Sequence, residues 1–390
     1  MSHRMLTTNT CFCFMLKFAQ CFGMLPVCGI SDGDCASLKF KWTAKRTLYS
    51  MVFLSLAILN TFFQLLKMVR MKTFIVFGQY VTLLFFSVTI VTVAIFIDVA
   101  RKWPNLMRKW AEVDDAMKSY GFPVGLHKKL KTVAFVVMTA AIAEHSLFLA
   151  FMFKHCQRGD SLRETVQLYF EHSFDQVFNV VPYNIVFGVI IQIFNLFSTV
   201  AWNFMDLFIM LVSLSLSFRF KQVVSHINTL VKRKETDINM WRTVREDYTR
   251  LSALCGTVDD VISTIILMSF ANNIYVVLVQ LYFTLKRPPS DGILDKIYYV
   301  YSFSFLIIRT VVVSLYAATI HSESKKPQYY LNNLSPTVYN SEVERFIHQT
   351  KYDTIALTGH QLFKVTKSLI LSVASAIVSY ELVLIQFNID

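Results

Sequence analysis

Apolar residues in this chain come in blocks of about twenty or more, separated by polar stretches. A block of that length spans the ~30 Å hydrocarbon core of a bilayer as an α-helix. The blocks do not alternate strictly between apolar and polar positions, which favours helices over the strands of a membrane barrel. The blocks are 47–66, 74–98, 132–153, 181–217, 258–284, 297–320 and 366–387. We therefore predict an all-α polytopic membrane protein with seven transmembrane helices.

The composition agrees with this pattern. Hydrophobic residues make up 54% of the chain and charged residues 16%, and 35 of the 390 residues are Phe. The net charge of +12 could indicate a nucleic-acid partner, but the basic residues flank the apolar blocks. If the N-terminus is cytosolic, the cytosolic connections carry about three times as many Lys and Arg residues as the outer ones, as the positive-inside rule requires. We therefore expect the partner of this basic chain to be a lipid bilayer and not a nucleic acid. The N-terminus is expected to be cytosolic and the C-terminus extracellular.

The fourth apolar block is too long for one crossing. A helix over 181–217 would be roughly 55 Å long, against ~30 Å of hydrocarbon. We therefore expect it to project into a bundle of cytosolic helices. Ser341 and Glu344 have the spacing of a capping box, and the following residues are predicted to run helically toward the last span. The predicted division of the chain is an N-terminal cytosolic or interfacial segment 1–46, a ligand-binding helical domain 47–320, cytosolic anchor helices 321–364 and a pore-lining last helix 365–390.

The N-terminal stretch "CFCFMLKFAQCFGMLP" predicts an interfacial helix before the first span. A cleaved signal peptide is a poorer interpretation, because Lys17 interrupts the apolar run and no small-residue cleavage site follows. The cysteines here lack the paired spacing of a zinc site, so we expect reduced packing residues rather than metal ligands.

Polar side chains recur inside the predicted spans, where an ionisable group is a functional hypothesis by default. Carboxylates, amides, tyrosines and a tryptophan together suit a sugar site, since hydroxyls need donors and acceptors and a pyranose face stacks on aromatic rings. The alternative is structural: Tyr as an interfacial belt, Asn and Asp as interhelical hydrogen-bond partners, and Arg309 paired with Glu144 or Asp206. The candidate ligand residues are Glu144, His145, Trp202, Asp206, Asn273, Tyr275, Tyr299 and Ser302. No motif supports catalysis, a metal or a cofactor, so we predict that the protein is not an enzyme.

Two neighbouring stripes follow from placing the last helix, "SYELVLIQF", at 100° per residue. Ser379, Leu382 and Gln386 form one stripe, and Tyr380, Val383 and Phe387 form the next. Around an axis shared by several copies, a ring of Gln386 amides would offer oxygen ligands. Rings of Leu382 and Phe387 would offer a hydrophobic gate. The alternative is an interfacial aromatic anchor with one amide between helices.

The same stretch resembles the signature that ends the last helix of insect gustatory receptors, with Glu after Tyr as in the sugar-sensing branch. Ser379 stands where Thr is usual. Other stretches similar to that branch run through nearly the whole chain, namely "KFAQCFGMLPVCGI", "ARKWPNLMRKW", "AEHSLF", "VAWNFMDLFIM" and "IALTGHQLFKVTKSLI".

The resemblance implies a sugar-gated nonselective cation channel of four subunits in the plasma membrane of chemosensory neurons. Sugar would bind in an outward-facing pocket within the first six helices, and the last helices would line a central pore. Its partners would be a mono- or disaccharide, permeating cations, lipid and other subunits. By this resemblance, Gln386 and Phe387 match the Gln-Phe at the pore end, and with Ser379, Leu382 and Val383 of the two stripes they are the predicted pore residues.

Three alternatives remain at this point. A modulatory subunit would need a related partner to conduct, which makes the assembly a heteromer rather than a homotetramer. A G-protein-coupled receptor would have the opposite orientation. A sugar transporter would typically show internal repeats, which this sequence lacks.

Overall fold

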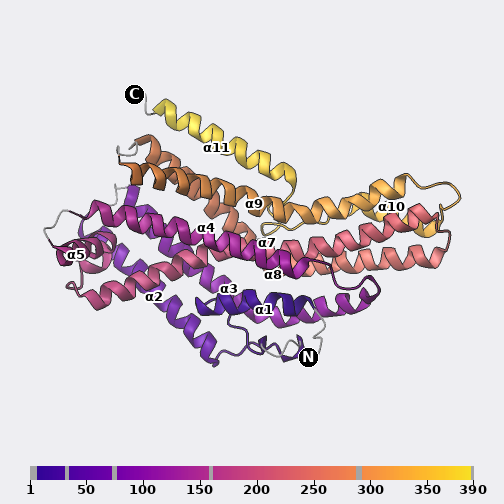
Figure 1. Ribbon diagram of the computed structural model, residues 1–390, viewed down its shortest axis with the longest axis horizontal. Helices are drawn as coiled ribbons and strands as arrows, with labels where there is room; N and C mark the ends of the chain where they lie inside the picture. The colour runs from indigo at the N-terminus through magenta and orange to yellow at the C-terminus, as the bar shows by residue number, and fades with distance from the viewer. Residues whose placement is uncertain (1–6, 31–34, 73–76, 158–160, 287–291, 388–390) are drawn as a thin grey trace.

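Helices account for nearly all the secondary structure in the computed structural model, which describes residues 7–30, 35–72, 77–157, 161–286 and 292–387 (Figure 1). The only β pairing among these residues is two isolated bridges. The α-helices are α1 Thr8–Cys21, α2 Lys45–Arg70, α3 Phe77–Ala116, α4 Leu126–His155, α5 Leu162–Ser173, α6 Asp175–Phe178, α7 Ile185–Arg233, α8 Ile238–Lys286, α9 Ile293–Asn332, α10 Ser341–Tyr352 and α11 Lys367–Phe387. The predicted all-α class is confirmed.

Six helices in the described part of the chain are long and apolar enough to cross a membrane: α2, α3, α4, α7, α8 and α9. In α11, the described side chains form a shorter apolar run, Lys367–Tyr380. These helices coincide with the seven predicted blocks, and most extend beyond them at the polar ends. The extensions arise because a helix needs no apolar residues once it leaves the lipid and packs against other helices.

The two longest helices, α7 and α8, have 49 residues each and are therefore about 74 Å long. Both exceed the bilayer, and for α7 this is what the overlong fourth block predicts. In Figure 1 they run beside α9 toward the end where α10 lies, and α2 and α5 lie at the opposite end. Because α9 continues unbroken through residue 320, no break in the helix marks the predicted domain boundary there. The division into domains stays a prediction.

The N-terminal helix predicted by the Phe- and Cys-rich stretch is α1, and it packs against α3. The ring of Phe12 meets Trp103 and Trp110 edge-on, at centroid distances of 5.6 and 5.7 Å. Thr7 begins α1 with a capping box to Thr10. Burial raises the pKa of the Cys11 thiol to about 12, so this cysteine is a neutral packing residue at physiological pH.

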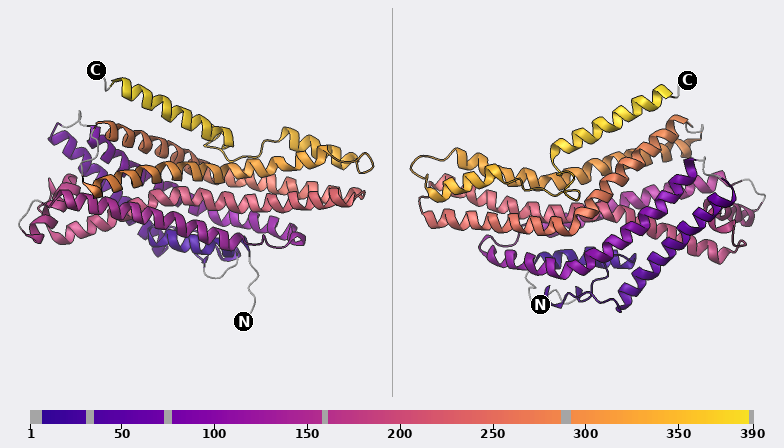
Figure 2. Two further views of the ribbon diagram at one scale, coloured as in Figure 1. Left: turned by 45° about the horizontal axis from the view of Figure 1, so that its top comes forward. Right: turned by 180° about the vertical axis from the view of Figure 1, so that it is seen from behind.

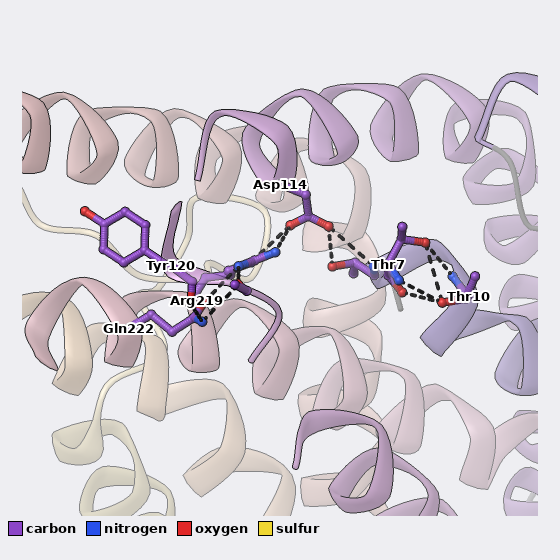
Figure 3. Close-up of polar contacts among 8 residues, drawn as sticks. Thr7, Thr10, Asp114, Tyr120, Arg219 and Gln222 are labelled. Carbon is purple, nitrogen blue, oxygen red and sulfur yellow. Dashed lines mark hydrogen bonds and ion pairs between the residues drawn. The ribbon is translucent and has the colours of Figure 1, made fainter. Parts of the chain in front are cut away.

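A buried charge pair holds α1, α3 and α7 together (Figure 3). The guanidinium of Arg219 in α7 is buried and donates from Nη2 to Asp114 Oδ1 in α3 at 2.7 Å. A further donor, the Thr8 hydroxyl of α1, lies 2.7 Å from Asp114 Oδ2. Arg219 Nη1 donates to the Gly121 carbonyl at 3.1 Å and to Gln222 Oε1 at 2.8 Å. The pair is thus hydrogen-bonded on both sides, which a buried charge requires.

Replacing Thr8 with Val should therefore loosen α1. A hydrogen bond to a charged group contributes about 1.5–3 kcal/mol, so we expect the free energy of unfolding to fall by about that amount. Faster hydrogen exchange in residues 8–21 would report the same change. The matched control is Thr132→Val, because the exposed Thr132 hydroxyl bonds only to the Lys128 carbonyl of its own helix. Equal exchange of α1 in both variants would contradict a role for Thr8 in holding it.

The helix predicted to begin near Ser341 and to run toward the last span differs from its prediction at both ends. The N-cap of α10 is Asn340, not Ser341, because the Asn340 side chain accepts hydrogen bonds from the backbone N–H groups of Glu342 and Val343. The helix then ends at Tyr352 instead of running on to the last span. Residues 353–366 form an irregular segment with one bridge, Thr358↔Lys364, and Asp259 of α8 holds it by accepting hydrogen bonds from the Thr358 N–H and hydroxyl groups.

Polar contacts join α10 to α8 and α9 at this end of the molecule. Arg245 Nε donates to Glu342 Oε2 at 2.8 Å, and the Tyr248 hydroxyl donates to the Ser324 carbonyl at 2.9 Å. The hydrogen bond from Arg245, together with that from Arg345, holds the pKa of Glu342 below its ordinary value. The carboxylate is therefore ionised at neutral pH and links α10 to α8, while the Tyr248 hydroxyl links α8 to α9.

Candidate functional site

A buried ion pair lies where α7, α8 and α9 meet. Arg309 Nε of α9 lies 2.9 Å from Asp206 Oδ2 of α7, and both side chains are almost completely excluded from solvent. This settles which carboxylate pairs with Arg309: of the two that the sequence allowed, it is Asp206. An unpaired charge at this depth would be costly, so each member makes the other tolerable.

The remaining hydrogen-bonding groups of this pair are also engaged. Ser269 Oγ of α8 donates to Asp206, and Asn273 Nδ2 of α8 donates to both carboxylate oxygens at 3.2 and 3.1 Å. Arg309 donates to Asn273 Oδ1 at 2.9 Å and to Asn203 Oδ1 at 2.6 Å. Asp206 and Asn273 were both predicted as ligand residues. In the structure their side chains form hydrogen bonds to other protein groups. Ser269 and Asn203 were not among the predicted residues, although the i, i+4 spacing of Ser269 and Asn273 places both on one face of α8.

Trp202 covers the outer side of this network. Its ring lies 4.6 Å from the Arg309 guanidinium carbon, within cation–π distance, and Phe305 lies 5.4 Å from the same carbon. Counted from the outer ends of α7 and α9, Asp206 and Arg309 are about 32 and 24 Å along their helices. The network therefore lies far from the outer ends of these helices, and Trp202 lies about one turn nearer the outer end of α7.

A cavity of about 120 Å³ adjoins Trp202 between α3, α7 and α8. Most of its lining is apolar, but Trp202, Asn272 and Tyr275 contribute to it. Trp202 Nε1, Asn272 Nδ2 and the Tyr275 hydroxyl are buried and have no hydrogen-bond partner among the described residues. Buried polar atoms are seldom left unpaired, and such atoms around a cavity call for a ligand or water. Three of them around one small space make it the best candidate for the ligand site.

A second set of predicted residues meets between α4 and α9, nearer their outer ends. The Ser302 hydroxyl donates to Glu144 Oε1 at 2.8 Å. Two turns further into the membrane on α9 lies Arg309, so Ser302 and Arg309 share a face of that helix. Tyr299 packs edge-on against Phe151 of α4, at 5.7 Å between ring centroids. The structure thus brings Glu144 and Ser302 together and places Tyr299 in an aromatic cluster beside them.

His145 is separate from these contacts. It is buried, its ring lies 6.4 Å from Phe148, and its Nε2 has no hydrogen-bond partner among the described residues. The structure places it on α4 next to Glu144 but not in the cavity lined by Trp202.

The last helix, α11, leads away from the other helices toward the C-terminus (Figures 1 and 2). Ser379 is exposed, as are Ser372 and Ser375 on the turns before it. Ile377 packs against a cluster formed by Val277 and Leu281 of α8 and Leu306 of α9. The side chains of Leu382, Val383, Gln386 and Phe387 lie outside the described residues, so their predicted pore role stays a prediction.

Comparison with known proteins decides the family. The chain matches the family described as "Trehalose receptor" over residues 7–390. This chain belongs to the trehalose receptor family of insect gustatory receptors. It is 33% identical to "Gustatory receptor for sugar taste 64f" of Drosophila melanogaster over 96% of this chain and 80% of that protein. It is 30% identical to "Gustatory receptor 5a for trehalose" of the same species, over 96% of this chain and 84% of that protein. The predicted family is confirmed, and with it the expectation that the protein is not an enzyme.

This gustatory receptor family member has the same fold as a receptor of known structure. The insect olfactory receptor OR5 of Machilis hrabei superposes with a TM-score of 0.64, covering 97% of this chain and all of that one at 15% identity. Its complex with eugenol gives a TM-score of 0.62 at 14% identity. The family and the shared fold together identify a chemosensory receptor that crosses the membrane several times.

Proposed function

We propose that this protein is a sugar-gated nonselective cation channel that acts as a sweet-taste receptor in the plasma membrane of chemosensory neurons. The observation that carries the proposal is the cavity lined by Trp202, Asn272 and Tyr275, where three buried polar atoms have no partner in the part of the chain that the structure describes. Sugar hydroxyls can serve all three, and the indole can stack on an apolar sugar face. Two relatives, named for sugar taste and for trehalose, agree with this ligand class.

The volume of the cavity bears on the mechanism. At about 120 Å³ it lies below the roughly 300 Å³ at which ligand pockets usually begin, so a sugar enters only if the surrounding helices move apart. Val276 of α8 lines the cavity, and the next residue, Val277, belongs to the cluster on which Ile377 of α11 packs. Movement of α8 by the sugar is thus transmitted to the last helix. The sugar favours opening through tighter binding to the open state.

The first test is expression of the chain alone in an otherwise unresponsive cell, with membrane current recorded during a panel of mono- and disaccharides. A prompt, reversible cation current that needs no added G protein is the expected result. Silence despite surface expression would favour the alternative of a modulatory subunit, and co-expression with a related receptor would then restore the current. A current that depends on a G protein would contradict the proposal.

The contact between Glu144 and Ser302, outside the cavity lined by Trp202, provides a prediction for a second sugar contact. We expect Glu144→Gln to lower the sugar-evoked current at unchanged surface expression, because Gln still accepts the Ser302 hydrogen bond but has lost the charge that binds sugar hydroxyls most strongly. A loss of one charge-assisted hydrogen bond corresponds to about a tenfold rise in the half-maximal sugar concentration. An unaltered dose response would remove Glu144 from the pocket.

The pore is predicted to be lined by the last helices of four subunits. Replacing Gln386 with Leu removes the side-chain amides that, around the pore axis, would offer oxygen ligands to passing cations. We therefore expect the relative permeability of the channel to different cations to change, and the half-maximal sugar concentration to stay the same. Reversal potentials under asymmetric ionic conditions measure this effect. Identical reversal potentials in both proteins would show that Gln386 does not line the pore.

A further inference from the structure

An apolar groove of about 400 Å³ lies between α1, α4 and α7, away from the cavity described above. Its walls are almost entirely hydrophobic. The residues that line it include Phe14 and Phe18 of α1, Phe135 and Ile142 of α4, and Leu207 of α7. Phe135 is 72% exposed and Ile142 54% exposed, so the groove opens sideways onto the membrane-facing surface of α4.

The length of the groove matches half a bilayer. Its lining on α4 runs from Lys131 to Ile142, a separation of eleven positions that corresponds to about 16 Å of helix. Half of a ~30 Å hydrocarbon layer is the depth that the acyl chain of one leaflet occupies. The groove therefore accommodates a chain from one leaflet only.

The charge at one end identifies the leaflet and the headgroup. Lys131 lines the groove at the end of α4 that the Lys and Arg bias places in the cytosol, and Lys128 is one turn nearer that end on the same face. Both side chains are exposed, and neither lies within ion-pair distance of a carboxylate that the structure describes. Two unneutralised amines above an apolar groove of this depth are complementary to a negatively charged phospholipid headgroup.

We propose that this groove is a binding site for an anionic phospholipid of the cytosolic leaflet, with one acyl chain along α1, α4 and α7 and its phosphate at Lys131. The lipid covers Phe14 and Phe18 of α1, which the protein leaves half-buried. It thereby holds α1 against α4 from the membrane side, in addition to the hydrogen bond that Thr8 makes to Asp114.

Photo-crosslinking of the full-length receptor tests this site. The receptor is placed in phosphatidylcholine nanodiscs with a trace of phosphatidylserine that carries a photoreactive group on its acyl chain, and labelled peptides are mapped by mass spectrometry. We expect labels on 134–142 and 14–18, displaced by unlabelled phosphatidylserine but not by extra phosphatidylcholine. Equal displacement by both lipids would overturn the headgroup assignment, and labels spread evenly over the membrane surface would overturn the site.

Matched variants separate a specific site from general attraction to basic residues. Lys131→Gln should lower labelling by phosphatidylserine about fivefold, the effect expected for one lysine near an anionic surface. Lys129→Gln removes the same charge about 200° away on α4 and should leave labelling unchanged. Thr139→Phe fills the groove from its exposed wall and should remove the labels from 134–142. Equal effects of the two lysine variants, or full labelling of Thr139→Phe, would overturn the proposal.

Discussion

Replacing Arg309 with methionine should remove most of the folded receptor from the cell surface. The change leaves the Asp206 carboxylate buried with no cation, and breaking a buried pair in this way costs about 3–5 kcal/mol. Because a domain is stable by only about 5–15 kcal/mol, this loss is a large part of the total. Fluorescence-detected size exclusion of the solubilised protein would show a reduced monodisperse peak and a lower melting temperature.

The double variant Asp206→Leu with Arg309→Met distinguishes a charge effect from a packing effect. Replacing both members of a buried pair by apolar residues is often neutral, so we expect the double variant to recover most of the folded protein. Arg101→Met is the control for loss of an arginine, because Arg101 is exposed and pairs only with Asp98 within its own helix. If the double variant were as poorly folded as Arg309→Met, the loss of folding would not come from the uncompensated charge.

The same double variant bears on the predicted ligand role of Asp206. Its two oxygens already accept hydrogen bonds from Ser269 and Asn273 and pair with Arg309. A folded double variant that keeps its sugar dose response would assign Asp206 to the framework of the pocket. One that loses the response would support direct contact with sugar.

The membrane helices could be predicted because lipid imposes a simple rule, a run of about twenty apolar residues. The same rule indicates that Asp206 and Arg309 need partners. The sequence allowed two partners for Arg309, the carboxylates of Glu144 and Asp206. Choosing between them requires the relative rotation and depth of α4, α7 and α9, which packing decides and hydropathy does not. The cap of α10 shows the same limit on a small scale, since Asn340 and Ser341 are both good N-caps and only the backbone conformation selects one.

Sequence patterns also indicate which residues are polar, but not which of their atoms are already bonded. Asn273 and Asn272 are adjacent and chemically identical. The first lies inside the ion-pair network, and the second presents to a cavity an amide nitrogen that has no partner among the residues described. A one-residue step on a helix turns a side chain by about 100°, which is enough to separate a structural role from a binding role.

Removing the unpartnered groups of the cavity should impair sugar sensing without destabilising the protein. The Tyr275 hydroxyl and the Asn272 amide nitrogen have no partner among the described residues, so Tyr275→Phe and Asn272→Leu remove no hydrogen bond that the structure describes. Both variants should therefore melt at or above the temperature of the unmodified receptor, because an unsatisfied buried polar group is itself a cost. If a sugar bonds to these atoms, each variant raises the half-maximal sugar concentration by roughly tenfold.

Combining the two changes should raise the half-maximal concentration on the order of a hundredfold, to the extent that neighbouring sites act independently. Tyr301→Phe is the matched control, because the Tyr301 hydroxyl donates to the Ala140 carbonyl at 3.1 Å and so has a structural partner. It should lower the melting temperature and leave the sugar response intact. The opposite pattern, in which the cavity variants lose stability but keep the dose response, would show that the three unpartnered atoms serve the fold through bound water and that the sugar binds elsewhere.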